Sequence, residues 1–183
     1  MLYIILAAVL VAADQLFKYW IVHTIPLWGE MALLPGVMAL TNVRNEGAAF
    51  SLFAGMQLLI VILTILVSAA ILVALCLGRP RLRSQRFALA LVLGGAVGNL
   101  LDRLLYGYVV DMFRTLFVDF AIFNIADCCI VVGGILFVLS VIFFSSNEKT
   151  LKIVPAPEGE IAAVYERLKA FRPEESHDPS DPG

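Results

Sequence analysis

The sequence predicts an all-α membrane protein with four transmembrane helices, and three observations support this fold class. Hydrophobic residues make up 61% of the 183 residues and the mean hydropathy is +0.91. Only 15% of the residues are charged, whereas soluble chains are about 45–50% apolar and about 25% charged. Four apolar runs are each long enough to cross a bilayer as a helix, which takes about 20 residues.

The four expected spans are separated by polar links. Helix is the conformation expected for each, because an open strand would leave backbone groups unpaired in lipid. The second span carries no charge, whereas Asp14 and Lys18 interrupt the first and Asp127 lies near the start of the fourth. The spans cover roughly residues 2–22, 56–77, 87–106 and 125–144.

Basic residues predict the orientation of the spans. The link at 78–86 carries four arginines, and Lys149 and Lys152 follow the fourth span. Cytoplasmic segments of membrane proteins carry such an excess. This link and both termini are therefore expected in the cytoplasm, and residues 23–55 and 107–124 on the outer side. The first span lacks a basic region before it and a small-residue cleavage site after it, so we expect a retained helix.

The C-terminal part of the chain differs in composition. Residues 147–183 are polar, acidic and proline-rich, which is typical of partly disordered segments. Within them, residues 158–171 predict a short amphipathic helix on the cytoplasmic surface. We therefore expect a membrane domain over 1–146 and a cytoplasmic tail over 147–183.

Polar residues gather at one depth of the predicted bundle. The first and third spans run outward and the fourth runs inward, which places these residues in the outer halves. A random distribution would not leave the inner halves nearly free of polar groups. The residues are Asp14, Lys18, Asn99, Asp102, Arg103, Asn124 and Asp127.

Each of these residues also has a purely structural interpretation. Asp14 and Lys18 share a helix face and fit an ion pair, and asparagines in spans fit interhelical hydrogen bonds. Arg103 fits a side chain that reaches lipid headgroups. Asp102 and Arg103 are adjacent and so do not face each other; if Asp102 only supports the third helix, Asp102→Asn should be milder than replacement of Asp111 or Asp127. Gly94 and Gly98 form a pair of small residues that permits close helix packing.

Asp111 alone fits an ordinary acid of an outer loop, whereas Asp127, a carboxylate at the membrane edge, is harder to explain structurally. They lie 16 residues apart in sequence, joined by a link that can fold back, so both can reach one point at the outer rim. Two carboxylates in one site do not both ionise easily, and one retains a proton. The ionised carboxylate can activate water while the protonated one donates to a carbonyl oxygen. This pair predicts hydrolysis of an amide bond without a metal or a covalent intermediate.

Other kinds of chemistry have no motif in the sequence. The three cysteines lie in apolar runs without the spacing of metal ligands, and no HExxH motif is present. We therefore expect no metal and no cofactor. No basic patch predicts nucleic-acid binding.

The sequence resembles the lipoprotein signal peptidase (signal peptidase II) family, the aspartyl peptidases of bacterial inner membranes. The resemblance covers roughly residues 10–135. It is specific because five blocks occur in order on four predicted spans. The blocks are "DQLFKYW" (14–20), "NVRNEGAAFSLF" (42–53), "GGAVGNLLDR" (94–103), "GYVVDMF" (107–113) and "FNIADCCI" (123–130).

The resemblance implies an activity and a set of site residues. Asp111 and Asp127 match the catalytic pair of the family. Its substrates are prolipoproteins, cleaved just before a diacylglyceryl-modified cysteine at the outer face of the membrane. The outward link 23–55, including "GAAFSLF", is then part of a small extracytoplasmic β/loop platform over the site. The residues that match polar or backbone groups around the site are Asp14, Lys18, Asn45, Gly47, Asn99, Arg103 and Asn124.

Two alternatives from other functional classes stay open at this stage. Converging Asp, Lys and Asn residues also suit a small proton-coupled transporter component, although the polar groups stop at the outer level. A non-catalytic membrane scaffold would leave the carboxylate pair unexplained. The partners expected are prolipoproteins and membrane lipid, and the chain is expected to be a monomer.

Overall fold

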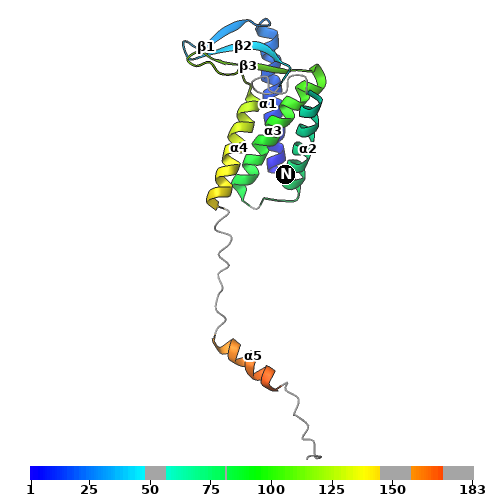
Figure 1. The fold of residues 1–183 in the computed structure, drawn as a ribbon, viewed down its shortest axis with the longest axis vertical. Coiled ribbons are helices and arrows are strands. Elements are labelled where there is room, and N and C mark those ends of the chain that lie inside the picture. The colour runs from blue at the N-terminus through cyan, green and yellow to red at the C-terminus, as the bar shows by residue number, and fades with distance from the viewer. Residues whose placement is uncertain (48–56, 81, 145–157, 171–183) are drawn as a thin grey trace, which may run out of the picture. The chain divides into compact units, whose positions relative to one another are not determined.

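The structure of the chain is a computed structural model that describes residues 1–47, 57–80, 82–144 and 158–170. The chain divides into two units, Met1–Ser146 and Asn147–Gly183. The first unit contains four helices and three strands within the described residues (Figure 1). In chain order they are α1 (Leu2–Thr24), β1 (Glu30–Leu34), β2 (Met38–Asn45), α2 (Gln57–Cys76), α3 (Arg83–Tyr106), β3 (Val109–Thr115) and α4 (Ile125–Phe144).

The four long helices confirm the predicted spans. Each is long and apolar enough to cross a membrane, and α4 covers the residues predicted for it. The start predicted for the second span, residue 56, lies outside the described residues. α3 begins at Arg83, four residues earlier than predicted. A search for apolar runs stops at charged residues, but the polar turn at 83–86 continues the same hydrogen-bonded helix.

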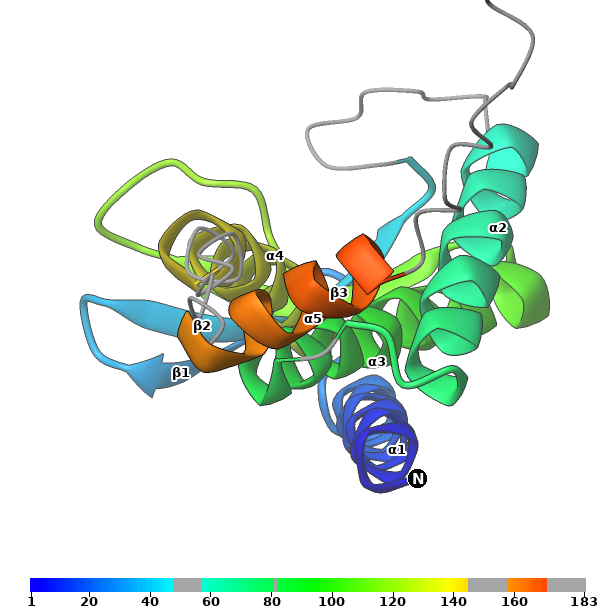
Figure 2. The same ribbon diagram turned by 90° about the horizontal axis from the view of Figure 1, so that it is seen from below.

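α3 lies at the centre of the bundle. Half of its apolar stretch is buried, compared with 17–22% for the other three helices, and Figure 2 shows it between α1, α2 and α4. Gly94 and Gly98 allow α1 to approach, as predicted: an added Cβ would lie 2.9 Å from Leu10 Cβ and 2.8 Å from Asp14 Oδ2, respectively. Gly95 does the same for α4, because an added Cβ would overlap the backbone oxygen of Ala126.

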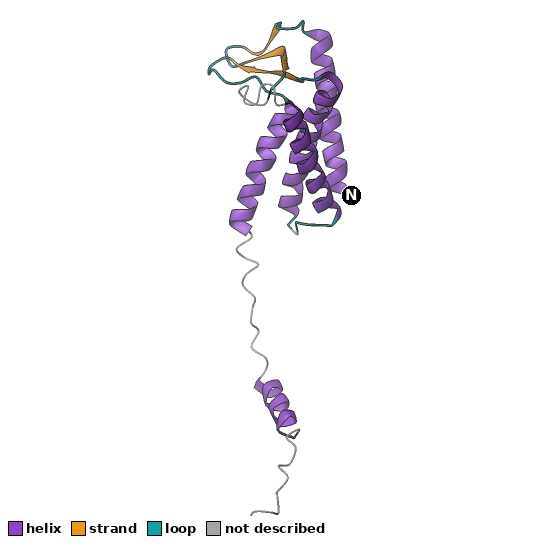
Figure 3. Cartoon of the chain, turned by 45° about the vertical axis from the view of Figure 1, so that its right-hand side comes forward, coloured by secondary structure: helices purple, strands orange, loops and turns teal. Residues whose placement is uncertain are grey.

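A small sheet covers the end of the bundle where α1 ends and α4 begins (Figure 3). It is antiparallel, in the order β1-β2-β3. A cluster of buried side chains joins this sheet to the last turn of α1, which fixes β3 above the helices. The cluster consists of Ile21, Ile25, Leu40, Val110 and Met112. The sheet confirms the strand platform that the resemblance implied.

The second unit contains one described helix, α5 (Glu158–Ala170). It confirms the short helix predicted at 158–171, one residue shorter at its C-terminal end. Within the tail, the residues predicted to be disordered lie outside the described ones.

Candidate functional site

Asp111 and Asp127 are brought together by two elements that meet at the sheet end of the bundle. Asp111 is a buried residue of β3, and Asp127 lies in the first turn of α4. Asn124 contacts both carboxylates. Its side-chain amide donates to Asp111 Oδ1 at 2.6 Å, and its backbone N–H donates to Asp127 Oδ2 at 3.1 Å.

Asn124 also caps α4. The backbone N–H of Asp127 donates to Asn124 Oδ1 at 2.9 Å, while Asp127 accepts from the backbone of Asn124. Such reciprocal bonds satisfy N–H groups that have no partner inside a helix. The positive end of the helix dipole favours a negative charge at this position. The end of the helix therefore stabilises this aspartate at the head of a long apolar run.

Two further amides complete the hydrogen bonding of the carboxylates. Asn45, from β2, donates to Asp111 Oδ2 at 2.8 Å, and Asn99, from α3, donates to Asp127 Oδ1 at 2.7 Å. Asn124 in turn donates to Asn99 Oδ1 at 3.1 Å. Every oxygen of the two carboxylates thus accepts at least one N–H. Four elements of the fold supply these donors and acceptors.

Arg103 lies beside this cluster and points into the protein. Its guanidinium donates to the backbone oxygen of Gly47 at 3.2 Å and to that of Asn99 at 3.3 Å. The alternative of an arginine that reaches headgroups is therefore wrong for this structure. The backbone N–H of Gly47 donates to Asn45 Oδ1 at 3.0 Å, so Gly47 connects two side chains of the site. The rest of "GAAFSLF" lies outside the described residues.

Asp14 and Lys18 lie beneath the site and form an ion pair at 2.8 Å. Asp102 does more than support α3, so the condition for a mild Asp102→Asn variant is not met. Asp102 is buried, pairs with Lys18 at 2.9 Å, and accepts the backbone N–H of Val110 in β3 at 3.1 Å. Sequence reasoning also missed Gln15, whose amide donates to Asp102 Oδ1 at 2.8 Å. Since Gln15 lies on α1 between Asp14 and Lys18 in sequence, its proximity to them was the only available signal.

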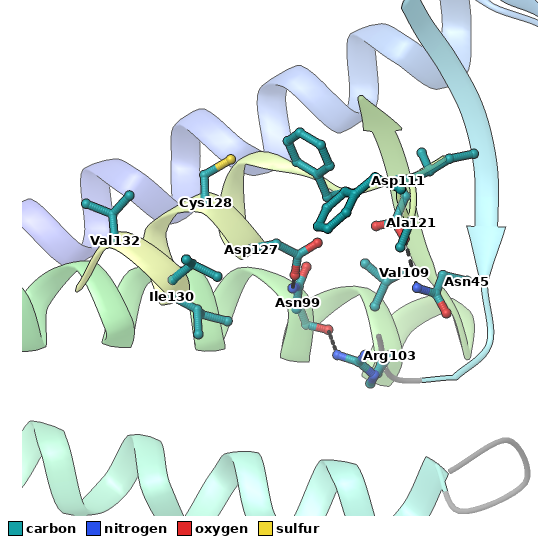
Figure 4. Close-up of a pocket in the computed structure, with 14 residues that line it drawn as sticks. Asn45, Asn99, Arg103, Val109, Asp111, Ala121, Asp127, Cys128, Ile130 and Val132 are labelled. Atoms are coloured by element: carbon teal, nitrogen blue, oxygen red, sulfur yellow. Dashed lines mark hydrogen bonds between the residues drawn. The ribbon is translucent and has the colours of Figure 1, made fainter. Parts of the chain in front are cut away.

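The two carboxylates line a cavity of about 530 Å³ (Figure 4). Its polar side is formed by Asp111, Asp127, Asn45, Asn99 and Arg103. The other side is apolar and comes from the first turns of α4, from the segment before it and from the start of β3. This apolar side could not be predicted, because its residues look like any other lipid-facing or loop hydrophobics. It consists of Val109, Phe120, Ala121, Ile122, Phe123, Cys128, Ile130, Val131 and Val132.

The environment of Asp111 favours its protonated form. Burial removes water from the carboxylate and raises its pKa from 3.8 to about 6, and the nearby charge of Asp127 acts in the same direction. Hydrogen bonds from Asn45 and Asn124 lower the pKa but do not cancel the effect of burial. Asp111 thus retains a proton in weakly acidic solution.

The raised pKa of Asp111 predicts a pH-dependent stability. The folded protein holds this proton more tightly than the unfolded chain, so stability contributed by protonation is present below pH 4 and is lost as the pH rises through about 6. Across this pH window we expect the free energy of unfolding of the wild type to fall by roughly 3 kcal/mol relative to that of Asp111→Asn. Thermal unfolding of both proteins in detergent between pH 4 and pH 8 measures it. Parallel curves for the two proteins would contradict the prediction.

Comparisons with known proteins agree with the fold and with the family that the sequence resembles. The family model described as signal peptidase (SPase) II matches residues 6–143. The lipoprotein signal peptidase of Lactobacillus johnsonii is 40% identical over 149 residues, covering 80% of this chain and 96% of that protein. The lipoprotein signal peptidase of Streptococcus pyogenes serotype M5 is 42% identical over 139 residues, covering 75% of this chain and 91% of that protein.

Two solved structures share the architecture. Both are described as bacterial membrane enzymes solved by the in meso method. The structure at 2.3 Å resolution has a TM-score of 0.75 and 33% identity, and covers 81% of this chain and 92% of that one. The structure at 1.9 Å resolution has a TM-score of 0.70 and 32% identity, and covers 78% of this chain and 93% of that one. No relative among these supports the transporter alternative.

Proposed function

Since the chain belongs to the signal peptidase II family, we propose that it removes signal peptides from prolipoproteins and that Asp111 and Asp127 carry out the hydrolysis. The observation that supports this most directly is the pair of carboxylates on one cavity, each held by amide donors. Burial raises the pKa of Asp111 to about 6 and so favours its protonated form, while a helix N-terminus stabilises a negative charge on Asp127. The two residues therefore differ in the way that acid–base catalysis needs.

The proposed reaction uses each carboxylate once as base and once as acid. Asp127 takes a proton from water as the water oxygen attacks the scissile carbonyl carbon, and Asp111 gives its proton to the carbonyl oxygen. A tetrahedral diol results. As the carbon–nitrogen bond breaks, Asp127 gives its proton to the leaving nitrogen, and Asp111 takes one from a hydroxyl of the diol. Both carboxylates return to their starting states, and no metal or cofactor takes part.

The neighbouring amides and Arg103 hold the pair and the substrate in place. Asn45, Asn99 and Asn124 fix the carboxylates through the hydrogen bonds described above. Arg103 lines the cavity with Asn45, and its bond to the backbone oxygen of Gly47 holds it where it can orient the substrate backbone. Correct placement of reacting groups accounts for a large part of enzymatic rate enhancement.

The substrate is an acyl-modified precursor at the membrane surface. Apolar side chains of α4 continue the cavity wall from Asp127 towards the lipid-facing surface; Cys128, Val131 and Val132 are both cavity-lining and exposed. A diacylglyceryl chain on the cysteine after the scissile bond fits such a wall. We therefore propose cleavage just before this cysteine, by a single chain embedded in the bacterial inner membrane.

Cleavage by the purified protein tests the function. The protein in lipid vesicles is incubated with a diacylglyceryl-modified prolipoprotein and, as a control, with the same precursor carrying serine in place of the modified cysteine. We expect mass spectrometry to find a cut before the modified cysteine and none in the control. Equal cleavage of both precursors would contradict the role of the lipid, and cleavage of neither would contradict the function.

The site is proposed to face the outer side of the membrane, with both termini in the cytoplasm. The basis is the arginine-rich link before α3. In a background in which Cys76, Cys128 and Cys129 are replaced by alanine, Asp119→Cys should react with a membrane-impermeant thiol reagent in intact cells. Leu82→Cys should react only after the membrane is permeabilised. The opposite labelling pattern would contradict the proposed orientation.

A further inference from the structure

Two buried carboxylates outside the cavity hold the backbone directly before the proposed catalytic residues. Asp14 Oδ1 accepts the N–H of Ala126 at 3.0 Å, and Ala126 precedes Asp127. Asp102 Oδ2 accepts the N–H of Val110 at 3.1 Å, and Val110 precedes Asp111. The two contacts are equivalent, although they involve different helices and different parts of the site.

Lys18 joins these two carboxylates. Its ammonium lies 2.8 Å from Asp14 Oδ2 and 2.9 Å from Asp102 Oδ2, and none of the three residues is more than 3% exposed. The remaining proton of the ammonium is directed to Asn99 Oδ1 at 2.9 Å. Gln15 fixes the free oxygen of Asp102 at 2.8 Å. A continuous chain of short contacts therefore runs from the peptide before Asp127, through Lys18, to the peptide before Asp111.

We propose that Asp14, Lys18 and Asp102 form a spacer that sets the distance between Asp111 and Asp127. The proposal rests on the proposed function of these two aspartates. Asp14 and Asp102 are positioning residues: they lie behind the site and act through the backbone. A buried ion pair is weak evidence for stability, because desolvation of the charges offsets their attraction. Its value here lies in the fixed geometry of the two peptides that it holds.

The distance matters because the two carboxylates act together. The charge of Asp127 adds to the effect of burial in raising the pKa of Asp111. If the two carboxylates move apart, the repulsion between them weakens and the pH range in which the pair holds one proton becomes narrower. A displacement of about 1 Å can also cost about 10²-fold in rate.

The test uses Asp14→Asn, Asp102→Asn and the double variant in lipid vesicles. Asparagine keeps an oxygen for the backbone N–H but loses the ionic attraction to Lys18. We expect each single variant to lower kcat by about 10- to 100-fold, and the acid and alkaline limbs of the pH–rate profile to move towards each other. Because one break opens the whole chain of contacts, the double variant should be little slower than the worse single one.

Ser84→Ala serves as the matched control. Ser84, in the first turn of α3, shares a hydrogen bond of 2.8 Å with Ser140 of α4. It lies on α3 about four turns before Asn99, at the opposite end of the helix from the site. This variant also removes a polar contact between two helices, so it should leave the rate and both limbs of the pH profile unchanged.

Three outcomes distinguish the interpretations. If the fold-losses in kcat of the two single variants multiply in the double variant, and the limbs of the pH–rate profile do not move, then Asp14 and Asp102 act independently. This result would overturn the proposed spacer. If these variants fail to fold because Lys18 is left without its partners, the triple variant Asp14→Asn, Lys18→Met, Asp102→Asn replaces them, since it leaves no unpaired charge. A pH–rate profile of the triple variant with both limbs where the wild type has them would also overturn the proposal. Failure of the aspartyl mechanism itself would appear separately, as activity retained by Asp111→Asn or Asp127→Asn.

Discussion

Asp111→Asn and Asp127→Asn are each expected to lower the rate of prolipoprotein cleavage by about 10²–10⁴-fold, the usual contribution of acid–base catalysis. Asparagine keeps the shape of the side chain, but it can neither take a proton from water nor return one to the leaving group. The double variant should be little worse than either single variant, because the two groups act as one unit. A cleavage assay in vesicles, at matched amounts of folded protein, measures the loss.

Asp119→Asn is the control for these two variants. Asp119 lies in the exposed segment between β3 and α4 and does not line the cavity with the pair, so its replacement should leave cleavage unchanged. The free-enzyme pH profile of the wild type should be bell-shaped, with activity declining on the alkaline side as Asp111 loses its proton near pH 6. Near-normal turnover by Asp127→Asn would end the aspartyl interpretation and leave Asp127 as a helix-capping residue.

Gly95→Ala is expected to have the second largest effect. The added methyl would overlap the backbone oxygen of Ala126 and lie 2.9 Å from Ile130 Cγ1, and backbone cannot rotate away as a side chain can. α4 must therefore move away from α3 at its first turn, which carries Asp127. Overpacking costs about 1–3 kcal/mol, and a shift of the catalytic group by about 1 Å costs about 10²-fold in rate. Thermal unfolding and the cleavage assay measure the two effects.

Gly134→Ala provides the comparison within α4. An added Cβ at this position meets nothing within 4 Å. Because alanine is a better helix former than glycine, by about 1 kcal/mol, this variant should be neutral or slightly stabilising and fully active. If both glycine variants behaved alike, close packing of α3 on α4 would not be what sets the position of Asp127.

The sequence predicts the spans well because hydropathy and helix length act locally. The end of each apolar run determines where a span must stop, which is why α4 matches its predicted bounds. It predicts less of the sheet, because strand pairing depends on partners such as Val43 and Asp111 that lie far apart in the chain. The platform was expected only from the resemblance, and its side of the membrane stays a prediction.

The site residues were predictable to different degrees. A carboxylate in or near an apolar span is expensive and therefore conspicuous, which identified Asp14 and Asp127 as candidates; Asp111 was identified only through its pairing with Asp127. Asp102 was placed at the same depth, but nothing in the sequence showed what it contacts. Helix spacing gives the face of a residue, not the element packed against that face; only the three-dimensional arrangement shows that Asp102 contacts both α1 and β3. Apolar cavity residues such as Phe123 gave no signal at all.

The hydrogen bond between Asp14 and the backbone of Ala126 joins residues 112 positions apart, and this separation has a consequence for biosynthesis. The ribosome makes α1 first and α4 after α2 and α3, so the peptide held by Asp14 emerges only when three helices have already been synthesised. A nascent chain that contains Asp111 but not yet α4 has half of the proposed catalytic pair and lacks the cavity wall that α4 supplies. The proposed site is therefore complete only after α4 has been made.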